Sequence, residues 1–345
     1  MPITVSQKKK APQYVQSVAP SNPSTGDTWY DTSQRVLKVW NGFAWLASDV
    51  VISRYGYACG GGSTIDRFQF PFDSGTTSHV GNLSGTRGVI AGCNSSNYGY
   101  CMGGNDSSNN LSTIDRITFP FDSGTASHVG NLSGVRNGAA GCNSSNYGYC
   151  MAGYDGSNLL STIDRITFPF DSGTASHVGN LTKSVYNPPG CNSSNYGYCM
   201  GGHNYTSVDR FQFPFDSGTA SHTGNLTEDK FDCAGCNSSN YGYCMGGYKS
   251  PTIQFSTIDR ITFPFDSGTA SHVGDLTGTR YFCVGCNSTL HGYCMGGKSP
   301  GFPFSIIDRI TFPFDSGIAS HVGDLSRSRG GVAGIDQTDF VSMFI

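Results

Sequence analysis

One phrase of sequence repeats six times between residues 55 and 329, and this repeat constrains the fold more than any other feature. Each copy contains a variant of Tyr-Gly-Tyr-Cys-Met-Gly-Gly, a variable stretch, and a variant of Ile-Asp-Arg-Ile-Thr-Phe-Pro-Phe-Asp-Ser-Gly-Thr-Ala-Ser-His-Val-Gly-Asn-Leu. The aspartate of the Ile-Asp-Arg step recurs at intervals of 49, 49, 45, 50 and 49 residues. The six are Asp66, Asp115, Asp164, Asp209, Asp259 and Asp308. A period near 50 residues indicates supersecondary units that stack or surround an axis.

Each copy contains four short segments with strand-like sequence. In the second copy they are residues 91–93, 98–102, 113–121 and 126–132, separated by Asn-Ser-Ser-Asn, the variable stretch after Gly-Gly, and Asp-Ser-Gly. No segment shows the 3.6-residue apolar period of a helix, and glycine interrupts every candidate. Four antiparallel strands in about 50 residues fit one blade of a β-propeller. The repeat therefore predicts an all-β, six-bladed propeller over residues 49–345.

The first and last copies predict how the ring closes. The first copy lacks a Gly-Cys-Asn strand, whereas the chain ends with two apolar segments, residues 332–335 and 340–345. An open sheet edge invites aggregation, and a closed ring removes it. We expect these C-terminal strands to complete the first blade beside residues 54–59.

The order of segments within a copy resembles the kelch repeat. The second strand-like segment ends in Gly-Gly in five copies and in Ala152-Gly153 in the remaining one. The sequence departs from the kelch pattern because the fourth segment contains Ser-His and lacks tryptophan. The resemblance implies a kelch-like propeller fold and does not extend to kelch binding partners.

The N-terminal region differs from the repeats. Residues 1–20 are polar and contain proline, which predicts an extended arm, and residues 21–48 predict a β hairpin with a tight turn at Asn-Gly. A hairpin this small is only marginally stable alone. We therefore expect its rings to pack on one another and on a partner surface or neighbouring chain. The expected attachment or oligomer contacts are Trp29, Tyr30, Trp40 and Trp45.

Between Pro23 and Trp45 the sequence fills the pattern Pro-x-x-Gly-Asp-x-Trp-Tyr-Asp-Thr, a few residues, and Leu-x-Val-Trp-Asn-Gly-x-x-Trp. This stretch resembles a short module of tailed-bacteriophage virion and tail-fibre proteins. The resemblance implies a structural virion protein in the tail or on the particle surface, assembled in the host cytoplasm. It also implies that the N-terminal module binds other virion proteins and that the chain forms a homo-oligomer in the particle.

Composition narrows the partners. Charged residues make up only 13% of the chain, and the net charge is -3. Nucleic acids and anionic membranes both demand a basic surface, so we expect neither as a partner. The sequence contains no run of 18 apolar residues and no apolar signal-peptide core at its start, so we expect a soluble protein that is neither inserted in a membrane nor exported by that route.

The 13 cysteines largely follow the repeat. One lies in each Gly-Cys-Asn step and one in each Tyr-Gly-Tyr-Cys step, with three left over. If the turn is centred on Ser95-Ser96, the two cysteines of a copy are out of register for a disulfide. Neither Cys-x-x-Cys pairs nor histidines at ligand spacing accompany them, so a zinc site is not expected. We expect buried, reduced thiols.

Repetition also argues against a catalytic or metal site. A ring of like groups can bind an ion at a propeller axis, but a residue present in every blade more often serves packing or turn hydrogen bonds. The repeated histidines are His79, His128, His177, His222, His272 and His321. The Asp-Ser-Gly-Thr turn resembles the Asp box of sialidase propellers without its tryptophan. Nucleophile-elbow, P-loop, dinucleotide and zincin motifs are missing. We predict no metal, no cofactor and no enzymatic activity, and keep a propeller hydrolase as the third hypothesis.

The sequence varies in two connections of each copy, after Gly-Gly and after the fourth strand. Strand direction reverses at each connection, so both emerge on one face of a meander, and the uniform Asn-Ser-Ser-Asn and Asp-Ser-Gly turns tile the other. Surface loops drift in any protein, but the uniform turns are surface loops too. The first set covers residues 105–111, 154–160, 203–206, 248–255 and 298–304, and the second residues 86–90, 135–139, 183–189, 228–233, 279–283 and 327–331.

These connections carry aromatic rings among asparagine, serine and glycine, a composition typical of recognition surfaces. Low charge favours a neutral glycan or a protein as ligand. We predict host-surface recognition, with a saccharide favoured, and the alternative is a purely architectural virion protein that decorates or cements the particle. The candidate ligand-binding residues are Tyr154, Tyr186, His203, Tyr205, Phe231, Tyr248, Phe255, Tyr281, Phe282 and Phe302.

Overall fold

The structure is a computed structural model, and its regular elements are all strands. It describes residues 14–25, 27–33, 36–40, 42–43, 45–47, 50–51, 55–299, 302–337 and 342–343. Contacts divide the chain into two compact units, Met1–Ser53 with Asp339–Ile345, and Arg54–Thr338. Each unit is described by itself below.

The smaller unit contains a four-stranded sheet. Its strands pair in the order β1 (Tyr14–Gln16), β2 (Thr28–Asp31), β3 (Val36–Trp40) and β4 (Trp45–Ala47). β1 runs parallel to β2, whereas β2, β3 and β4 pair antiparallel. The predicted hairpin is therefore part of a larger sheet, because three residues of the predicted arm pair with it. Residues 1–13 of that arm lie outside the described residues. β5 (Val50–Val51) pairs with β34 (Ser342–Met343).

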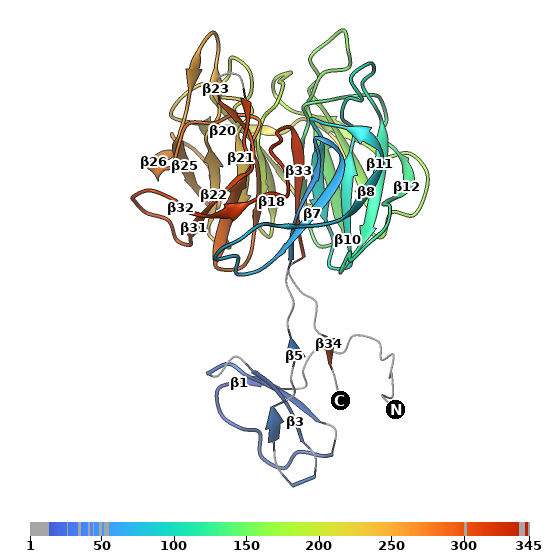
Figure 1. Cartoon of the computed structure of the whole chain (residues 1–345), viewed down its shortest axis with the longest axis vertical. Coiled ribbons are helices and arrows are strands. Elements are labelled where there is room, and N and C mark those ends of the chain that lie inside the picture. Colours follow the sequence, from blue (N-terminus) through green and yellow to red (C-terminus); the bar gives the residue numbers. More distant parts are fainter. Residues whose placement is uncertain are drawn as a thin grey trace. The chain divides into compact units, whose positions relative to one another are not determined.

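The larger unit is a six-bladed β-propeller, as the repeat predicts (Figure 1). Each blade is a four-stranded antiparallel sheet, and the second contains β9 (Ala91–Asn94), β10 (Tyr98–Met102), β11 (Thr113–Thr118) and β12 (Ser127–Asn131). The third strand was predicted to continue to residue 121 and ends earlier, because Pro120 has no N–H to donate to a neighbouring strand.

The remaining blades repeat this order. The third contains β13 (Ala140–Asn143), β14 (Tyr147–Met151), β15 (Thr162–Thr167) and β16 (Ser176–Asn180); the fourth β17 (Gly190–Asn192), β18 (Tyr196–Met200), β19 (Ser207–Gln212) and β20 (Ser221–Asn225); the fifth β21 (Ala234–Asn237), β22 (Tyr241–Met245), β25 (Thr257–Thr262) and β26 (Ser271–Asp275); and the sixth β27 (Val284–Asn287), β28 (His291–Met295), β31 (Ile306–Thr311) and β32 (Ser320–Asp324). Short ribbons extend two of the variable loops, β23 (Tyr248–Lys249) with β24 (Ile253–Gln254), and β29 (Lys298–Ser299) with β30 (Phe302–Pro303).

The first blade joins the two ends of the repeat region. β33 (Val332–Gln337) pairs antiparallel with β6 (Tyr55–Gly60), followed by β7 (Gly62–Gln69) and β8 (Ser78–Arg87). This confirms that a C-terminal strand completes the first blade. The second apolar segment does not join it as predicted: the described part of residues 340–345 is β34, which pairs with β5. Residue 54 and the rest of that segment lie outside the described residues.

The innermost strands of the six blades meet around the axis through glycine. The six glycines at this position are Gly92, Gly141, Gly190, Gly235, Gly285 and Gly334. A Cβ on any of them would lie 2.0 to 2.5 Å from the carbonyl oxygen of the equivalent glycine in the adjacent blade. Contacts this short leave no room for a side chain, so the repeated Gly-Cys-Asn step is explained by its glycine.

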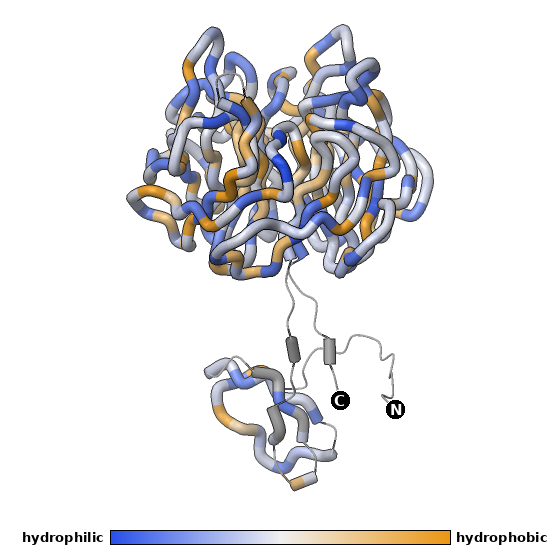
Figure 2. Tube along the Cα trace, in the orientation of Figure 1, coloured by the Kyte–Doolittle hydropathy of each residue, from blue (hydrophilic) through white to orange (hydrophobic). Residues whose placement is uncertain are grey.

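Apolar packing fills the space between consecutive blades. The inner-strand thiol of Cys93 lies against Gly148 of the third blade, and a Cβ on that glycine would be 2.5 Å from the sulfur. The same contact recurs around the ring, with Ile335 in place of cysteine against Gly99. The Tyr100 hydroxyl accepts a hydrogen bond from the Phe170 amide of the next blade at 3.0 Å. Apolar residues accordingly recur along the strands inside the propeller (Figure 2).

Buried ion pairs also tie neighbouring blades together. The connection after the fourth strand sends a cation to the Ile-Asp-Arg aspartate of the next blade, as Arg136 does to Asp164 at 3.0 Å. The Ser133 amide and hydroxyl donate to the same carboxylate, each at 2.8 Å. Burying a carboxylate is costly unless it is paired and hydrogen-bonded. The equivalent pairs are Arg87–Asp115, Lys230–Asp259, Arg280–Asp308 and Arg329–Asp66.

We predict that Arg136→Met lowers the free energy of unfolding by about 3 to 5 kcal/mol, because Asp164 would stay buried without its cation. Urea denaturation measures this loss. The matched control is Arg116→Met, which removes a more exposed pair with Asp171 and should cost about 1 kcal/mol or less through that pair. Equal losses in the two variants would contradict the structural role given to the buried pair.

Candidate functional site

The two faces of the propeller are formed by different connections between strands. β6 begins at Tyr55 beside Gln337 and ends at Gly60 beside Val332. The face at the Tyr55 end holds the turns between strands 1 and 2 and between strands 3 and 4 of each blade, and we call it the uniform face. The face at the Gly60 end holds both sets of variable connections, and we call it the variable face. β23 marks this face at the top of Figure 1. Both ends of the propeller unit therefore lie at the uniform face.

The repeated Asp-Arg pairs belong to the scaffold. The Asp115 carboxylate forms an ion pair with the buried Arg87 of the preceding blade. Arg116 forms an ion pair with Asp171 in the Asp-Ser-Gly turn of the following blade. Arg116 also lies over the Tyr98 ring, 4.5 Å from its centroid. The repeated histidine is half exposed, and its Nδ1 lies 3.9 Å from the carboxylate in the second blade. The repeated aspartates, arginines and histidines therefore make contacts within and between blades.

The variable face brings five of the predicted ligand-binding residues into one continuous aromatic arc. His203 packs edge-on against Phe231 with ring centroids 4.9 Å apart, and Phe231 packs against Tyr248 at 5.4 Å. The arc continues from Tyr248 to Tyr281 at 5.2 Å and from Tyr281 to Phe282 at 5.5 Å. It spans three consecutive blades. Phe231 is buried and the other four rings are partly exposed.

The other five predicted residues are not part of the arc. Tyr154 and Tyr186 form a separate edge-on pair with centroids 6.2 Å apart. Phe255 lies near the Lys230 ammonium, 5.8 Å from its ring centroid. Tyr205 and Phe302 are exposed, the latter at 76%. Their assignment as ligand contacts stays a prediction.

Where the axis opens on the variable face, six equivalent residues adopt a left-handed backbone. They are Val89, Gly138, Asn187, Asp232, Phe282 and Gly331, with φ between 51° and 68°. Amide-to-carbonyl hydrogen bonds join five of the six neighbouring pairs around the axis. Four of the six carry side chains, and left-handed conformations of such residues are uncommon and cluster at functional sites. This ring fixes the backbone from which the aromatic arc projects.

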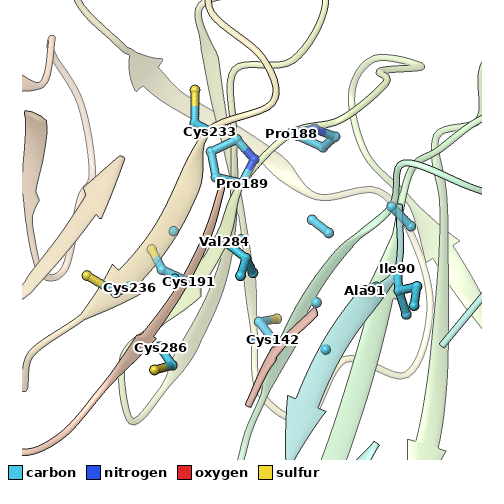
Figure 3. Close-up of a pocket in the computed structure, with 18 of the residues that line it drawn as sticks. Ile90, Ala91, Cys142, Pro188, Pro189, Cys191, Cys233, Cys236, Val284 and Cys286 are labelled. Carbon is cyan, nitrogen blue, oxygen red and sulfur yellow. The ribbon is translucent and has the colours of Figure 1, made fainter. Parts of the chain in front are cut away.

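An axial cavity of about 140 Å³ continues from this ring toward the uniform face (Figure 3). Pro189 and Cys233 lie near its variable-face end, and Cys236 and Cys286 lie further along. Next to the mouth, the buried Asp232 accepts a hydrogen bond from the Asn187 side-chain amide. Burial raises the pKa of Asp232 well above its ordinary value, and the Asn187 hydrogen bond opposes this shift.

The uniform-face end of the axis is lined by one polar side chain from each inner strand. Five are asparagines, and the sixth is Asp336. The Asn94 backbone N–H donates a hydrogen bond to the Asn143 side-chain Oδ1 of the adjacent blade at 3.2 Å, and three further pairs of neighbouring asparagines repeat this bond. Among the described residues, Asp336 takes no part in this ring of bonds, and burial raises the pKa of its carboxyl to about 7.

The cysteines are buried and unpaired, as predicted. The turn is centred on Ser96-Asn97, one residue later than the expected Ser95-Ser96, so Cys93 lies opposite Tyr100 and Cys101 opposite Gly92. Burial raises the pKa of the Cys142 thiol well above its usual range and that of Cys150 to about 12. Thiolates are the reactive form, so these groups are chemically inert in the folded protein.

The N-terminal rings predicted as attachment contacts pack mainly on one another. Trp45 lies 5.5 Å from both Trp29 and Trp40, measured between ring centroids. Trp29 is buried and donates from Nε1 to the Gln16 carbonyl at 2.9 Å. Its ring therefore forms part of the interior of the small sheet. Phe43, which was not predicted as a contact, is 91% exposed at the turn after β3.

Sequence reasoning missed the buried cations. Arg87, Arg136, Lys230, Arg280 and Arg329 were counted within variable connections, although they hold the scaffold. A signal was available, since a cation stands at the same offset in five of six copies. The axial position of Asp336 was also missed. Ile335-Asp336 is equivalent to the Cys-Asn step of the other copies, and this equivalence becomes visible only when β33 is placed in the first blade.

Neither family models nor curated proteins give a match to this chain. Within the described ranges, His, Cys, Asp and Glu side chains form no group of three that could hold a metal ion. The part of the chain that the structure describes contains no helix long and apolar enough to cross a membrane.

We predict that Asp336→Asn makes the protein more stable at pH 8 and leaves its stability at pH 4 nearly unchanged. The folded pKa of about 7 lies above the ordinary 3.8, so the native state binds the proton more tightly and stability falls as pH rises through this interval. Asp336 as a whole residue keeps partial solvent exposure, and screening by water limits the gain to the order of 1 to 2 kcal/mol. Urea denaturation at both pH values measures it. Asn94→Asp is the converse control, and an unchanged difference between pH 4 and 8 in both variants would contradict the assignment.

We predict that a disulfide reagent such as Ellman's reagent modifies almost none of the 13 thiols in the native protein and all of them in guanidinium. Burial blocks access to every thiol and disfavours the thiolate of most of them; a hydrogen bond with Cys294 lowers the pKa of Cys283, but that thiol is buried too. The absorbance of the released thiolate counts the modified groups. Rapid native labelling of more than one or two cysteines would show that the inner strands open readily.

Proposed function

We propose that this chain is a structural component of a bacteriophage virion, of the tail or tail-fibre kind, whose propeller presents the variable face to the host surface. The N-terminal module would bind other virion proteins or sister chains. The observation that carries the proposal is the segregation of sequence variation on the face opposite the two ends of the propeller unit. A subunit attached through its N-terminal module would leave this face available for a ligand.

The chemistry of the variable face supports a saccharide as that ligand. The aromatic arc offers ring faces and edges, and neighbouring loops supply neutral donors and acceptors. In the second and third blades, the Asn110 side chain links Asn105, Asn137 and the Tyr154 carbonyl at 2.7 to 3.1 Å. Fixed amides beside aromatic rings suit a ligand with many hydroxyl groups. The proposed activity is binding and not catalysis.

An architectural role is the second candidate, and two residues of the uniform face favour it. Leu290 and Ile318 are 50% and 70% exposed, where other copies have asparagine or threonine. Exposed apolar side chains at otherwise polar positions suit contact with another protein. In this case the propeller would bind assembled particles through its uniform face and would need no host ligand.

We predict that replacing Tyr205, Tyr248, Phe282 and Phe302 together with alanine weakens binding to host cells or to glycans on an array by more than a hundredfold. Each ring should contribute about 1 kcal/mol, or about fivefold in affinity. The full-length chain is used, and thermal unfolding confirms that the variant is folded.

The matched control is Leu290→Asn with Ile318→Thr, which restores the common residues on the opposite face. It should leave glycan and cell binding unchanged. Unchanged binding after replacement of the four aromatic residues would contradict the recognition hypothesis. Binding to assembled particles that depends on Leu290 and Ile318, without binding to cells, would establish the architectural alternative.

A further inference from the structure

A groove between the third and fourth blades differs from the equivalent places around the ring. It has a volume of about 680 Å³ and is open to solvent on the variable side of the propeller. Its walls come from the connection after β16, the connection before β19, strand β20 and the connection after β20. The lining residues are Thr182, Lys183, Asn204, Tyr205, Thr206, Ser207, His222, Asn225 and Asp229.

A short connection opens the groove. Only three residues separate Gly202 from Thr206, whereas seven separate Gly104 from Ser112 in the second blade. The first blade has a still shorter connection, but Arg327 lies across it and donates from Nη2 to the Gly61 carbonyl at 3.1 Å. Among the residues that the structure describes, no side chain is hydrogen-bonded across the groove in the fourth blade in this way, and the groove stays open.

Lys183 is at the position that Arg327 occupies in the last copy, two residues after the leucine that ends the repeated phrase. Its side chain is exposed and has no ion pair within the described part of the chain. The Asp229 carboxylate of the groove shares one cation with Glu228, because the Lys249 ammonium lies 2.5 Å from Asp229 and 3.0 Å from Glu228. Lys183 is therefore the cation of the groove lining that can still pair with an anionic ligand.

Thr182 of the groove lining also belongs to the blade junction that lacks a buried cation. Val185 stands where the other five junctions have arginine or lysine. The buried Asp209 is held by the Thr182 amide at 2.6 Å and hydroxyl at 2.8 Å, and its carboxylate lies 3.8 Å from the His222 Nδ1. The His222 imidazole is about half exposed and belongs to the groove lining.

Tyr205 supplies the aromatic surface of the groove. Its backbone amide donates to the Gly202 carbonyl at 3.0 Å, which fixes the short connection, and its ring is 37% exposed. Asn204 and Asn225 lie in the same lining and carry amide groups suited to hydroxyls. An aromatic ring, amides and a free cation thus meet in one depression.

We propose that this groove binds an acidic sugar residue of a surface glycan, such as a uronic acid. The pyranose ring lies against Tyr205, the carboxylate is bound by Lys183 and His222, and hydroxyls are bound by Asn204 and Asn225. This inference rests on the proposed recognition function and assigns it a site and a ligand class. The low overall charge of the chain favoured a neutral glycan, whereas the exposed Lys183 ammonium offers a pairing group to a carboxylate in this groove.

Saturation-transfer NMR on the full-length chain tests the site with matched probes. D-glucuronate and D-galacturonate are compared with D-glucose and D-galactose, which lack only the carboxylate. We expect transfer from a uronate to exceed that from its hexose at least fivefold. Lys183→Gln and Tyr205→Ala should each reduce the uronate signal at least fivefold, and raised salt should weaken it.

The control variants are Lys298→Gln and Leu159→Ala, which change a lysine and an exposed apolar side chain elsewhere on the variable face. Both should retain uronate binding. Equal signals from uronate and hexose overturn the acidic ligand class, and full binding by Lys183→Gln or Tyr205→Ala overturns the site. An absence of uronate binding by a chain that still binds host cells overturns this inference alone. Loss of the proposed recognition function would instead appear as a chain that binds neither cells nor any glycan.

Discussion

The close approach of six glycines around the axis is the constraint on which the rest of the propeller depends. Each inner strand places its backbone so near the next that a Cβ would meet a carbonyl oxygen at 2.5 Å or less. This spacing sets the width of the ring, and the width sets how far the outer parts of the blades can reach one another. The thiol-to-glycine contacts and the buried arginine-to-aspartate pairs then fit between consecutive blades. A side chain at the axis would widen the ring and disrupt both kinds of contact between consecutive blades.

The ties between blades explain why variation is confined to two connections. The repeated phrase supplies the inner glycine, the Tyr-Gly-Tyr strand, the Asp-Arg step and the turn that receives its arginine, as Arg116 binds Asp171. Each of these residues contacts an adjacent blade, so a change in one copy disturbs two blades. The variable connections share two such duties, the cation that reaches the next aspartate and the left-handed residue that hydrogen-bonds to its neighbour around the axis. Their remaining positions can change composition and length without loosening the ring.

The sequence predicted the architecture because a period, four strand-like segments and turn residues are all local signals. Closure by β33 was also predictable, since the first copy lacked a strand and the last copy had one too many. The parallel pairing of β1 with β2 could not be foreseen, because pairing across a loop of 11 residues leaves no periodic signal. The role of Arg136 was hidden for a related reason: its partner Asp164 lies 28 residues away in another blade. The aromatic arc depends on loop conformations that composition alone does not determine.

Departures from sixfold repetition are informative only after their packing is known. Ile335 replaces a cysteine and needs no functional explanation, because it fills the same space against Gly99. Val185 is different, since its apolar side chain leaves the buried Asp209 without the cation that every other junction provides. An uncompensated carboxylate is a cost to stability that the neighbouring threonine only partly offsets. That cost falls at the same junction as the short connection, the free Lys183 and the exposed Tyr205. The coincidence of four departures at one groove, and not any one of them, gives this place its claim to a ligand.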